Sequence, residues 1–153
     1  MSAKNERTLL FIKPDGVMRG LMGEIVNRIE KKGLLITAMK LLKLNRYKAE
    51  KFYDVHHNKP FFQALVNHVT SGPILAMVIE GTKAISVVRN IIGKTSSFEA
   101  EPGTIRGDFG LSITKNVVHA SDNMKNADME IAFFFKKGEI LRYKKSREKR
   151  FAF

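Results

Sequence analysis

The chain has 153 residues, of which 44% are hydrophobic and 27% are charged, and this is the size and composition of one globular domain. It contains no cysteine, so disulfides, thiolate catalysis and cysteine-ligated metal centres are excluded. The formal net charge of +12 favours anionic partners in general, and it does not choose among nucleotides, nucleic acids and anionic surfaces.

The N-terminal third predicts a strand, a turn and an amphipathic helix. Residues 7–13 form an apolar run that ends at Pro14-Asp15-Gly16, which is typical of a buried strand entering a turn. Residues 20–32 carry apolar side chains at helical spacing with polar side chains opposite. Gly33 then supplies the stop that commonly follows a helix.

Apolar runs and helical spacings continue to alternate through the middle of the chain. The longest apolar run, residues 34–44, is typical of a strand, and a third strand is indicated by a run that begins at Pro73. The predicted segments are a strand over 34–44, helices over 46–56 and 60–69, a strand over 73–80 and a helix over 82–92.

The C-terminal third begins with an irregular stretch, residues 93–115, that contains four glycines and a proline. A loop of this length inside a compact domain is usually functional or disordered. Ser121 or Asp122 is expected to cap a short helix that ends near Met129, and residues 130–135 are expected to form the fourth strand. The whole pattern predicts a single α+β domain, residues 1–153, with a ferredoxin-like four-stranded antiparallel sheet covered by helices.

Half of the positive charge lies in one C-terminal segment. Residues 136–150 hold eight cationic and two acidic side chains, a net charge of +6 within the basic C-terminal segment 136–153. A nucleic-acid or anionic-surface patch is one interpretation, and a solvated lysine-rich tail is the alternative. No apolar run approaches the roughly 20 residues of a membrane span, and the N-terminus lacks a signal peptide, so we expect a soluble cytoplasmic protein without membrane contact.

Two partial matches to phosphate and RNA motifs fail on inspection. Gly93-Lys94-Thr95 matches the end of a P-loop, but Val88 stands where that motif requires glycine, and the preceding segment predicts a helix rather than a strand. Residues 106–110 resemble the aromatic strand of RNA-recognition domains, but Asp108 occupies the position of a stacking aromatic residue.

Among the four histidines, His119 has the context best suited to chemistry. It follows the long loop and precedes the helix expected to start at Ser121, whose free N–H groups would meet a phosphate. Imidazole is also substantially neutral and nucleophilic at physiological pH. His56, His57 and His68 are expected to be ordinary surface or hydrogen-bonded residues.

The spacing around His119 is similar to a known active-site pattern. The segment Asn116-Val117-Val118-His119-Ala120-Ser121-Asp122 resembles the signature of nucleoside diphosphate kinases. Further segments in the same order resemble this family from about residue 6 to residue 135: residues 8–16 (TLLFIKPDG), 57–62 (HNKPFF), 71–73 (SGP) and 101–109 (EPGTIRGDF).

The resemblance implies a role for each matched residue. His119 would accept the γ-phosphoryl group and pass it to a nucleoside diphosphate in a ping-pong cycle, with Ser121 and Glu130 orienting the ring. Phe61 would stack on the base near Tyr53, which suits a family that accepts many nucleotides because every base has a π-face. The phosphates and ribose would be surrounded by Lys13, Arg89, Thr95, Arg106 and Asn116.

Taken singly, several of these residues have structural interpretations as well. Lys13 could be a strand-end lysine, Phe61 a core residue and Arg89 part of a solvated helix face. The matched order around His119 favours the functional interpretation for all three.

The resemblance also implies a cofactor and an assembly. Mg²⁺ would bridge the phosphates, with Asp122 as its protein ligand through water, and the enzyme would be a homo-oligomer, a hexamer or less often a tetramer. Three features depart from the family pattern: Ser97 replaces a usual proline, Asn123 replaces a usual small residue, and the tail after Phe135 is unusually basic. The rival hypotheses are a nucleic-acid-binding protein that uses residues 136–150, and a degenerate family member kept as a structural protein.

Overall fold

Four strands form one antiparallel sheet in the order β2-β3-β1-β4. In the computed structural model, which describes residues 4–145, β1 (Asn5–Ile12) pairs with β3 (Ile74–Thr82) on one side and with β4 (Val118–Ala120) on the other. The edge strand β2 (Leu35–Leu42) pairs with β3. This topology confirms the predicted α+β, ferredoxin-like fold.

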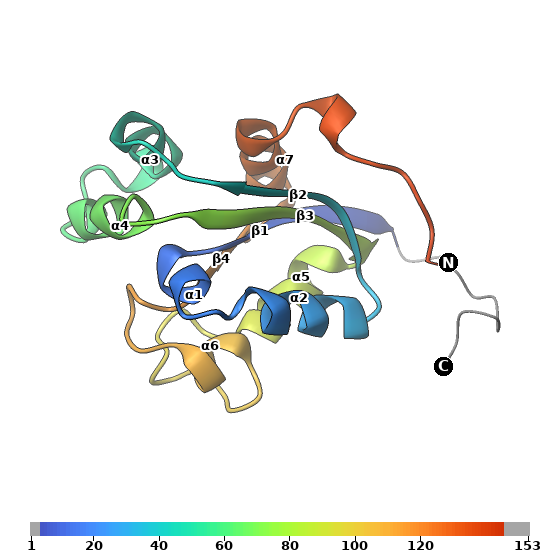
Figure 1. Cartoon of the computed structure of the whole chain (residues 1–153), viewed down its shortest axis with the longest axis horizontal. Coiled ribbons are helices and arrows are strands. Elements are labelled where there is room, and N and C mark those ends of the chain that lie inside the picture. The colour runs from blue at the N-terminus through green and yellow to red at the C-terminus, as the bar shows by residue number, and fades with distance from the viewer. Residues whose placement is uncertain (1–3, 146–153) are drawn as a thin grey trace.

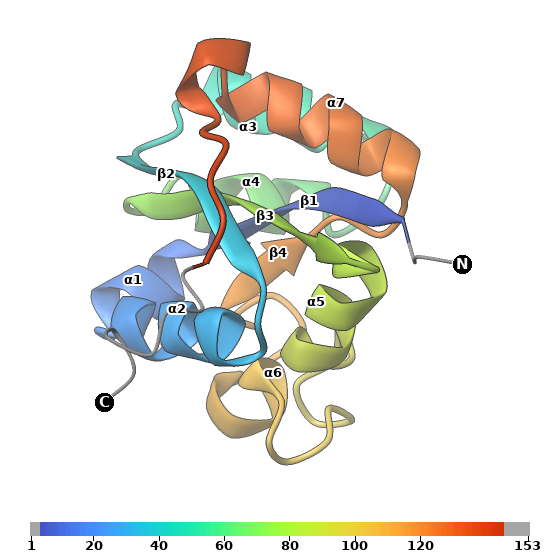
Figure 2. The same ribbon diagram turned by 90° about the vertical axis from the view of Figure 1, so that its right-hand side faces the viewer.

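Helices cover both faces of the sheet (Figures 1 and 2). Two 3₁₀ helices, η1 (Asp54–His56) and η2 (Lys137–Glu139), follow α3 and α7. One face is covered by α3 (Arg46–Phe52), α4 (Phe62–Val69) and α7 (Met124–Phe134), and the other by α1 (Pro14–Met18), α2 (Met22–Lys31), α5 (Ala84–Ile92) and α6 (Ile105–Phe109).

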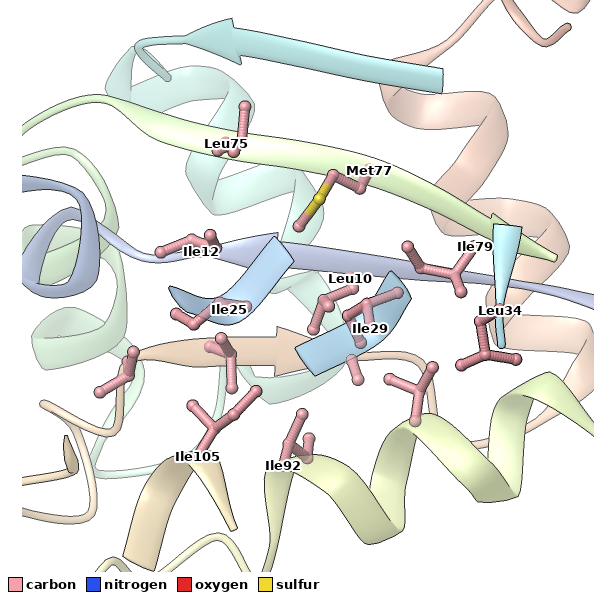
Figure 3. Close-up of a cluster of buried hydrophobic side chains, with 14 of the residues drawn as sticks. Leu10, Ile12, Ile25, Ile29, Leu34, Leu75, Met77, Ile79, Ile92 and Ile105 are labelled. Atoms are coloured by element: carbon pink, nitrogen blue, oxygen red, sulfur yellow. The ribbon is translucent and has the colours of Figure 1, made fainter. Parts of the chain in front are cut away.

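Alternate residues of β1 enter two separate hydrophobic clusters. Leu10 and Ile12 pack with α2 and α5 in the cluster drawn in Figure 3. Leu9 and Phe11 pack on the opposite face, against α3, α4 and α7. Successive side chains of a strand point to opposite faces of the sheet, and helices cover both faces here. All four side chains are therefore fully buried. This explains the continuous apolar run in the sequence.

The first three predicted strands and the main helices are confirmed, but the prediction of a fourth strand over residues 130–135 was wrong. Residues 130–134 belong to α7, Phe135 is its extended C-cap residue, and the fourth strand is the short β4 that contains His119. The side chain of Asn123, rather than Ser121 or Asp122, caps α7 by accepting a hydrogen bond from the Asn126 N–H at 2.8 Å. A short apolar run fits a buried helix as well as a strand, so periodicity alone could not separate the two.

The long stretch 93–115 is irregular apart from α6, whose N-terminus is capped by Thr104. Its two ends are joined by Ser97, a buried residue whose Oγ donates a hydrogen bond to the carbonyl of Ser112 at 2.9 Å. A proline could not make this bond, so the unusual residue at position 97 has a specific structural partner here.

The described part of the basic C-terminal segment, residues 136–145, passes over β2 (Figure 2). The Leu141 N–H donates to the Thr37 carbonyl at 2.9 Å, and the Lys145 ammonium donates to the Glu30 carbonyl at 2.7 Å. Residues 146–153 lie outside the described part of the chain. Among the helices of residues 4–145, none is long and apolar enough to cross a membrane.

Candidate active site

A cavity of about 540 Å³ opens beside β4 and falls within the usual size range of small-molecule sites. Residues from the end of β1, from α3 to α5, from the 93–115 stretch and from α7 converge on it. Every candidate residue from the sequence lines this cavity except Ser121, which lies behind Glu130: the lining includes Lys13, Tyr53, Phe61, Arg89, Thr95, Arg106, Asn116, His119, Asp122 and Glu130.

His119 lies in the middle of β4, directly opposite Phe11 in the strand register, and not at a helix N-terminus as expected. Its Nε2 is 2.5 Å from Oε1 of Glu130 on α7. The Ser121 hydroxyl donates to the other oxygen of Glu130 at 2.6 Å and also accepts the Leu9 N–H at 3.3 Å. Within residues 4–145, Nδ1 of His119 has no hydrogen-bond partner, so this nitrogen is the one left for chemistry.

Two aromatic rings fix the plane of the His119 imidazole. Phe11 stacks on it with ring centroids 4.9 Å apart, and Phe52 meets it edge-on at 5.2 Å. Aromatic packing of this kind prefers these offset and edge geometries. Sequence reasoning missed both phenylalanines, because Phe11 reaches His119 only through the pairing of β1 with β4.

Lys13 and Asn116 form a buried polar pair at the end of β1. The Lys13 ammonium donates to Oδ1 of Asn116 at 2.7 Å and to the Thr114 carbonyl at 3.4 Å. The Asn116 amide in turn donates to the Thr95 carbonyl at 3.0 Å. Burial and, to a smaller extent, the positive charge of Arg106 lower the pKa of Lys13 to about 8, although the negative charge of Asp15 acts in the opposite direction. The Lys13 side chain is therefore expected to lose its positive charge as the pH rises through about 8.

Arg106 is buried and binds three backbone carbonyls, one at the end of α5 and two at the entry to β4. Its guanidinium donates to the carbonyls of Gly93, Asn116 and Val118 at 3.1, 3.4 and 2.8 Å. Burial lowers the pKa of Arg106 to about 10, and the nearby charge of Arg89 acts in the same direction. At neutral pH the cavity therefore retains the positive charge of Arg106. The three carbonyl contacts also give Arg106 a structural role that the sequence did not predict.

The aromatic residues predicted to meet the nucleotide differ in burial. Tyr53 is buried, and burial raises the pKa of its hydroxyl well above the ordinary value, with the negative charge of Glu130 adding to the effect. Phe61 is 46% exposed, so it is not a core residue. His56 lies beside Phe61, with ring centroids 5.5 Å apart, and lines the cavity although the sequence gave no reason to select it.

Other lining residues also escaped prediction. They are mostly apolar, and apolar residues in a sequence are normally assigned to the core. They are Phe52, Val55, Leu65, Ile113, Thr114, Ala120, Asn126 and Met129. Of the remaining histidines, His57 is exposed and His68 is paired with Asp15 at 2.8 Å, as expected for ordinary histidines.

A metal ion would find few protein ligands in this cavity. Within residues 4–145, no cluster of three or more His, Cys, Asp or Glu side chains could hold one. Asp122 is exposed at the cavity wall, and its Oδ1 accepts hydrogen bonds from the amides of Asn123 and Asn126 at 3.1 and 2.7 Å. One carboxylate with a spare oxygen suits Mg²⁺, which keeps several waters and is held mainly by substrate phosphates.

Comparison with known proteins gives one consistent result. The family model described as nucleoside diphosphate kinase matches residues 6–140. The chain is 55% identical over 143 residues to the nucleoside diphosphate kinase of Archaeoglobus fulgidus, covering 94% of this chain and 95% of that protein. It is 60% identical over 136 residues to that of Staphylothermus marinus, covering 89% and 96%.

Solved structures agree with the sequence comparison. The Aquifex aeolicus nucleoside diphosphate kinase superposes with a TM-score of 0.89 at 45% identity, covering 90% of this chain and all of that one. The Halobacterium salinarum nucleoside diphosphate kinase in complex with CDP superposes with a TM-score of 0.89 at 42% identity, covering 96% and 97%.

Proposed function

The chain belongs to the nucleoside diphosphate kinase family, and we propose that it transfers phosphate through a phosphohistidine formed on His119. It is a phosphotransferase that moves the γ-phosphate of a nucleoside triphosphate to a nucleoside diphosphate. The observation that carries the proposal is the pairing of His119 with Glu130 inside a cavity that also holds Lys13, Arg89 and Arg106.

The hydrogen bond to Glu130 decides which nitrogen of His119 reacts. The proton on Nε2 is donated to the carboxylate, so the lone pair of Nδ1 is available to attack the γ-phosphorus. A bond forms between Nδ1 and phosphorus as the bond from phosphorus to the bridging oxygen breaks, and the nucleoside diphosphate leaves with those electrons. An oxygen of a second nucleoside diphosphate then attacks the phosphorus, and the nitrogen–phosphorus bond breaks to restore the imidazole.

The polar residues of the cavity would bind and orient the phosphates. Phosphoryl transfer spreads negative charge over the equatorial oxygens, so cations and N–H donors stabilise its transition state. Lys13, Arg89 and Arg106 supply three cationic groups around the cavity, and Asn116 and Thr95 supply neutral donors. Glu130, held by Ser121, stabilises the positive charge that develops on His119 as Nδ1 reacts.

The aromatic wall would bind the base without selecting it. Phe61 is exposed at the cavity wall, where a base can stack on its face, and Tyr53 closes the cavity nearby. Stacking and apolar contact are tolerant of base identity, so we propose broad acceptance of nucleotides.

Enzymes of this family use divalent cations, and for this chain we propose Mg²⁺. When bound, the ion would offset phosphate charge. Asp122 would hold it through a water molecule, since this carboxylate is exposed at the cavity wall and has one oxygen free of amide contacts. Asp122→Asn is expected to raise the Mg²⁺ concentration needed for half-maximal nucleotide affinity, measured by calorimetric titration.

The central experiment is incubation with γ-labelled ATP, followed by a quench and a test of the label. A phosphohistidine is acid-labile and base-stable, and we expect such a label on the wild-type protein and on a His57→Ala control, since His57 is exposed and outside the cavity. His119→Ala should carry no label while it still binds ADP. Acid-labile label that persists on purified His119→Ala would overturn the assignment.

Family membership also leads us to propose a homo-oligomer, a hexamer or less often a tetramer, located in the cytoplasm. Sedimentation equilibrium would distinguish the assemblies by mass, and a monomer at micromolar concentration would contradict the proposal.

A further inference from the structure

Val117, two residues before His119, has a backbone conformation that its side chain disfavours. Its φ of 75° lies in the left-handed region, where a β-branched residue is an outlier because its Cβ crowds the following carbonyl. The side chain is fully buried, so the conformation is not that of a loose surface turn. Such a strained residue persists only where its surroundings hold it in place.

The Val118 N–H donates to the Asn116 carbonyl at 2.9 Å and closes a tight turn centred on Val117, and the contacts that hold this turn from outside come from α1 and from the end of β1. Its N–H donates to Oδ2 of Asp15 at 3.1 Å, and its carbonyl accepts the Lys13 N–H at 2.8 Å. A Cβ added to Gly16 would lie 3.0 Å from Cγ1 of Val117 and 2.6 Å from Cγ2 of Ile12, so the backbone of α1 packs directly against the valine.

The strained residue sets the direction of two groups that line or frame the cavity. On its N-terminal side is Asn116, whose side chain contacts the Lys13 ammonium and the Thr95 carbonyl. On its C-terminal side is Val118, whose carbonyl accepts the hydrogen bond of Arg106 at 2.8 Å. A change of φ at Val117 would rotate these neighbours relative to each other.

We propose that His68, acting through Asp15, is a positioning residue that holds Val117 in its left-handed conformation and thereby places Asn116 and Arg106 in the cavity. The inference rests on the proposed function, because it assigns these placed residues to phosphate binding. His68 is on α4, a helix that contributes only Leu65 to the cavity lining, and its own side chain is absent from that lining.

His68 stabilises the buried Asp15 carboxylate, which in turn accepts the hydrogen bond from the Val117 N–H. The carboxylate of Asp15 is only 7% exposed, and a buried carboxylate must be hydrogen-bonded on its oxygens to be stable. Oδ2 accepts the Val117 N–H, and Oδ1 is 2.8 Å from Nε2 of His68. Burial alone would raise the pKa of Asp15, but the hydrogen bond and charge of His68, with Lys13 and the Val117 N–H, hold that pKa below its ordinary value. This relay of hydrogen bonds, from His68 through Asp15 to Val117, therefore joins α4, α1 and the entry to β4.

The test removes the His68 contact in backgrounds that differ only in strain at position 117. His68→Phe keeps a planar ring without a nitrogen, and His68→Gln keeps an N–H donor at the place of Nε2. Val117→Ala retains Cβ and so retains the strain, whereas Val117→Gly accepts φ of 75° without penalty. The readouts are the single-turnover rate of phosphoenzyme formation, the Kd for ADP and the urea concentration at the midpoint of unfolding.

We expect His68→Phe to slow phosphoenzyme formation or weaken ADP binding roughly fivefold or more, and His68→Gln to restore most of the loss. The penalty of His68→Phe should persist in Val117→Ala and shrink to less than about twofold in Val117→Gly. An equal penalty in both backgrounds would overturn the proposal, and so would wild-type behaviour of His68→Phe.

Two further measurements protect the conclusion. If His68→Phe does not fold, Asp15→Asn replaces it in the same two backgrounds with the same expected dependence on Val117. If the wild-type protein forms no phosphoenzyme, the proposed function fails, but the unfolding midpoints still report whether His68 and Val117 are coupled. Absence of that coupling would overturn the relay independently of the chemistry.

Discussion

Nε2 of His119 lies 2.5 Å from Oε1 of Glu130, so a hydrogen bond joins a strand residue to a helix residue eleven positions later. With the Nε2 proton donated to the carboxylate, Nδ1 has no hydrogen-bond partner within residues 4–145, and it is the nitrogen that we propose as the nucleophile. The second oxygen of Glu130 accepts a hydrogen bond from the Ser121 hydroxyl. Ser121, which is not part of the cavity lining, therefore orients the carboxylate, and the carboxylate orients the imidazole of His119.

The first prediction tests this contact with Glu130→Gln, which keeps the shape of the side chain and removes its charge. The amide can donate to Nε2 and so favour the wrong tautomer, and it cannot stabilise the charge that develops on the ring. Loss of a charged hydrogen bond costs about 1.5–3 kcal/mol, so phosphoenzyme formation should slow roughly 10- to 150-fold. The measurement is single-turnover transfer from ATP.

Glu30→Gln is the matched control. Glu30 is exposed on α2, outside the cavity, and the substitution removes the same charge there. Nucleotide affinity should change little in either variant. A Glu130→Gln protein with the wild-type transfer rate would show that the carboxylate does not orient the nucleophile.

The second prediction concerns pH and Lys13. Its pKa is lowered to about 8, so the free enzyme loses this positive charge as the pH rises through about 8. Because kcat/KM reports groups in the free enzyme, kcat/KM should fall on the alkaline side of pH 8. Bound phosphates favour the charged lysine, so kcat should decline only at higher pH.

Lys13→Arg provides the control, since a guanidinium stays protonated throughout this range. This variant should be less active because its geometry differs, but its kcat/KM should lose the alkaline decline near pH 8. An unchanged decline in Lys13→Arg would assign the titration to another group.

The third prediction separates the two roles of Arg106. Arg106→Ala removes a phosphate-binding cation and leaves the carbonyls of Gly93, Asn116 and Val118 without their donor. Transfer should fall at least roughly 10- to 150-fold, and the free energy of unfolding should fall by about 2–3 kcal/mol. Steady-state kinetics and urea titration measure the two effects.

Arg142→Ala, which removes an exposed arginine outside the cavity lining, should leave transfer unchanged and alter stability by less than about 0.5 kcal/mol. Full turnover of a folded Arg106→Ala would place this residue outside the phosphate site.

The fourth prediction tests the base-binding wall. Phe61 is 46% exposed, so Phe61→Ala should change the free energy of unfolding by less than about 1 kcal/mol. Loss of base stacking costs about 1–3 kcal/mol, so the Kd values for ADP, GDP and CDP should all rise roughly 5- to 150-fold. Phe98→Ala removes an 84% exposed phenylalanine outside the cavity lining and should leave these Kd values unchanged. A selective loss for one base would contradict simple stacking.

The fifth prediction is that deletion of residues 139–153 leaves the phosphotransfer chemistry intact, because no candidate site residue lies beyond Glu130. The deletion removes the Lys40–Glu139 ion pair and the contact of Leu141 with the Thr37 carbonyl, so the melting temperature should fall. Activity at 25 °C and thermal unfolding measure the two outcomes.

The same deletion tests the nucleic-acid hypothesis for residues 136–150. Affinity for single- or double-stranded nucleic acid, where the full chain has any, should fall and lose its salt dependence, since counterion release scales with the phosphates contacted. Binding that is insensitive to salt in the full chain would exclude an electrostatic tail. Loss of activity together with a smaller mass would show that the tail holds the oligomer together.

Local patterns in the sequence were sufficient for the first three strands and for most helices. Hydrophobic periodicity and turn residues act over a few positions, so they can be read without knowledge of long-range contacts. The resemblance to the family singled out the candidate site residues from the short segments around them, and in the structure all of these residues except Ser121 line one cavity.

The tertiary structure alone decided the rest, because the missing information is long-range. Only the pairing of β1 with β4 brings Phe11 against His119, and only the path of α7 brings Glu130 to Nε2. The apolar run at residues 130–135 was compatible with a strand until the cap at Asn123 and packing against β1 fixed it as helix. Burial and register depend on which distant segments meet, and a single sequence does not encode that choice in any local pattern.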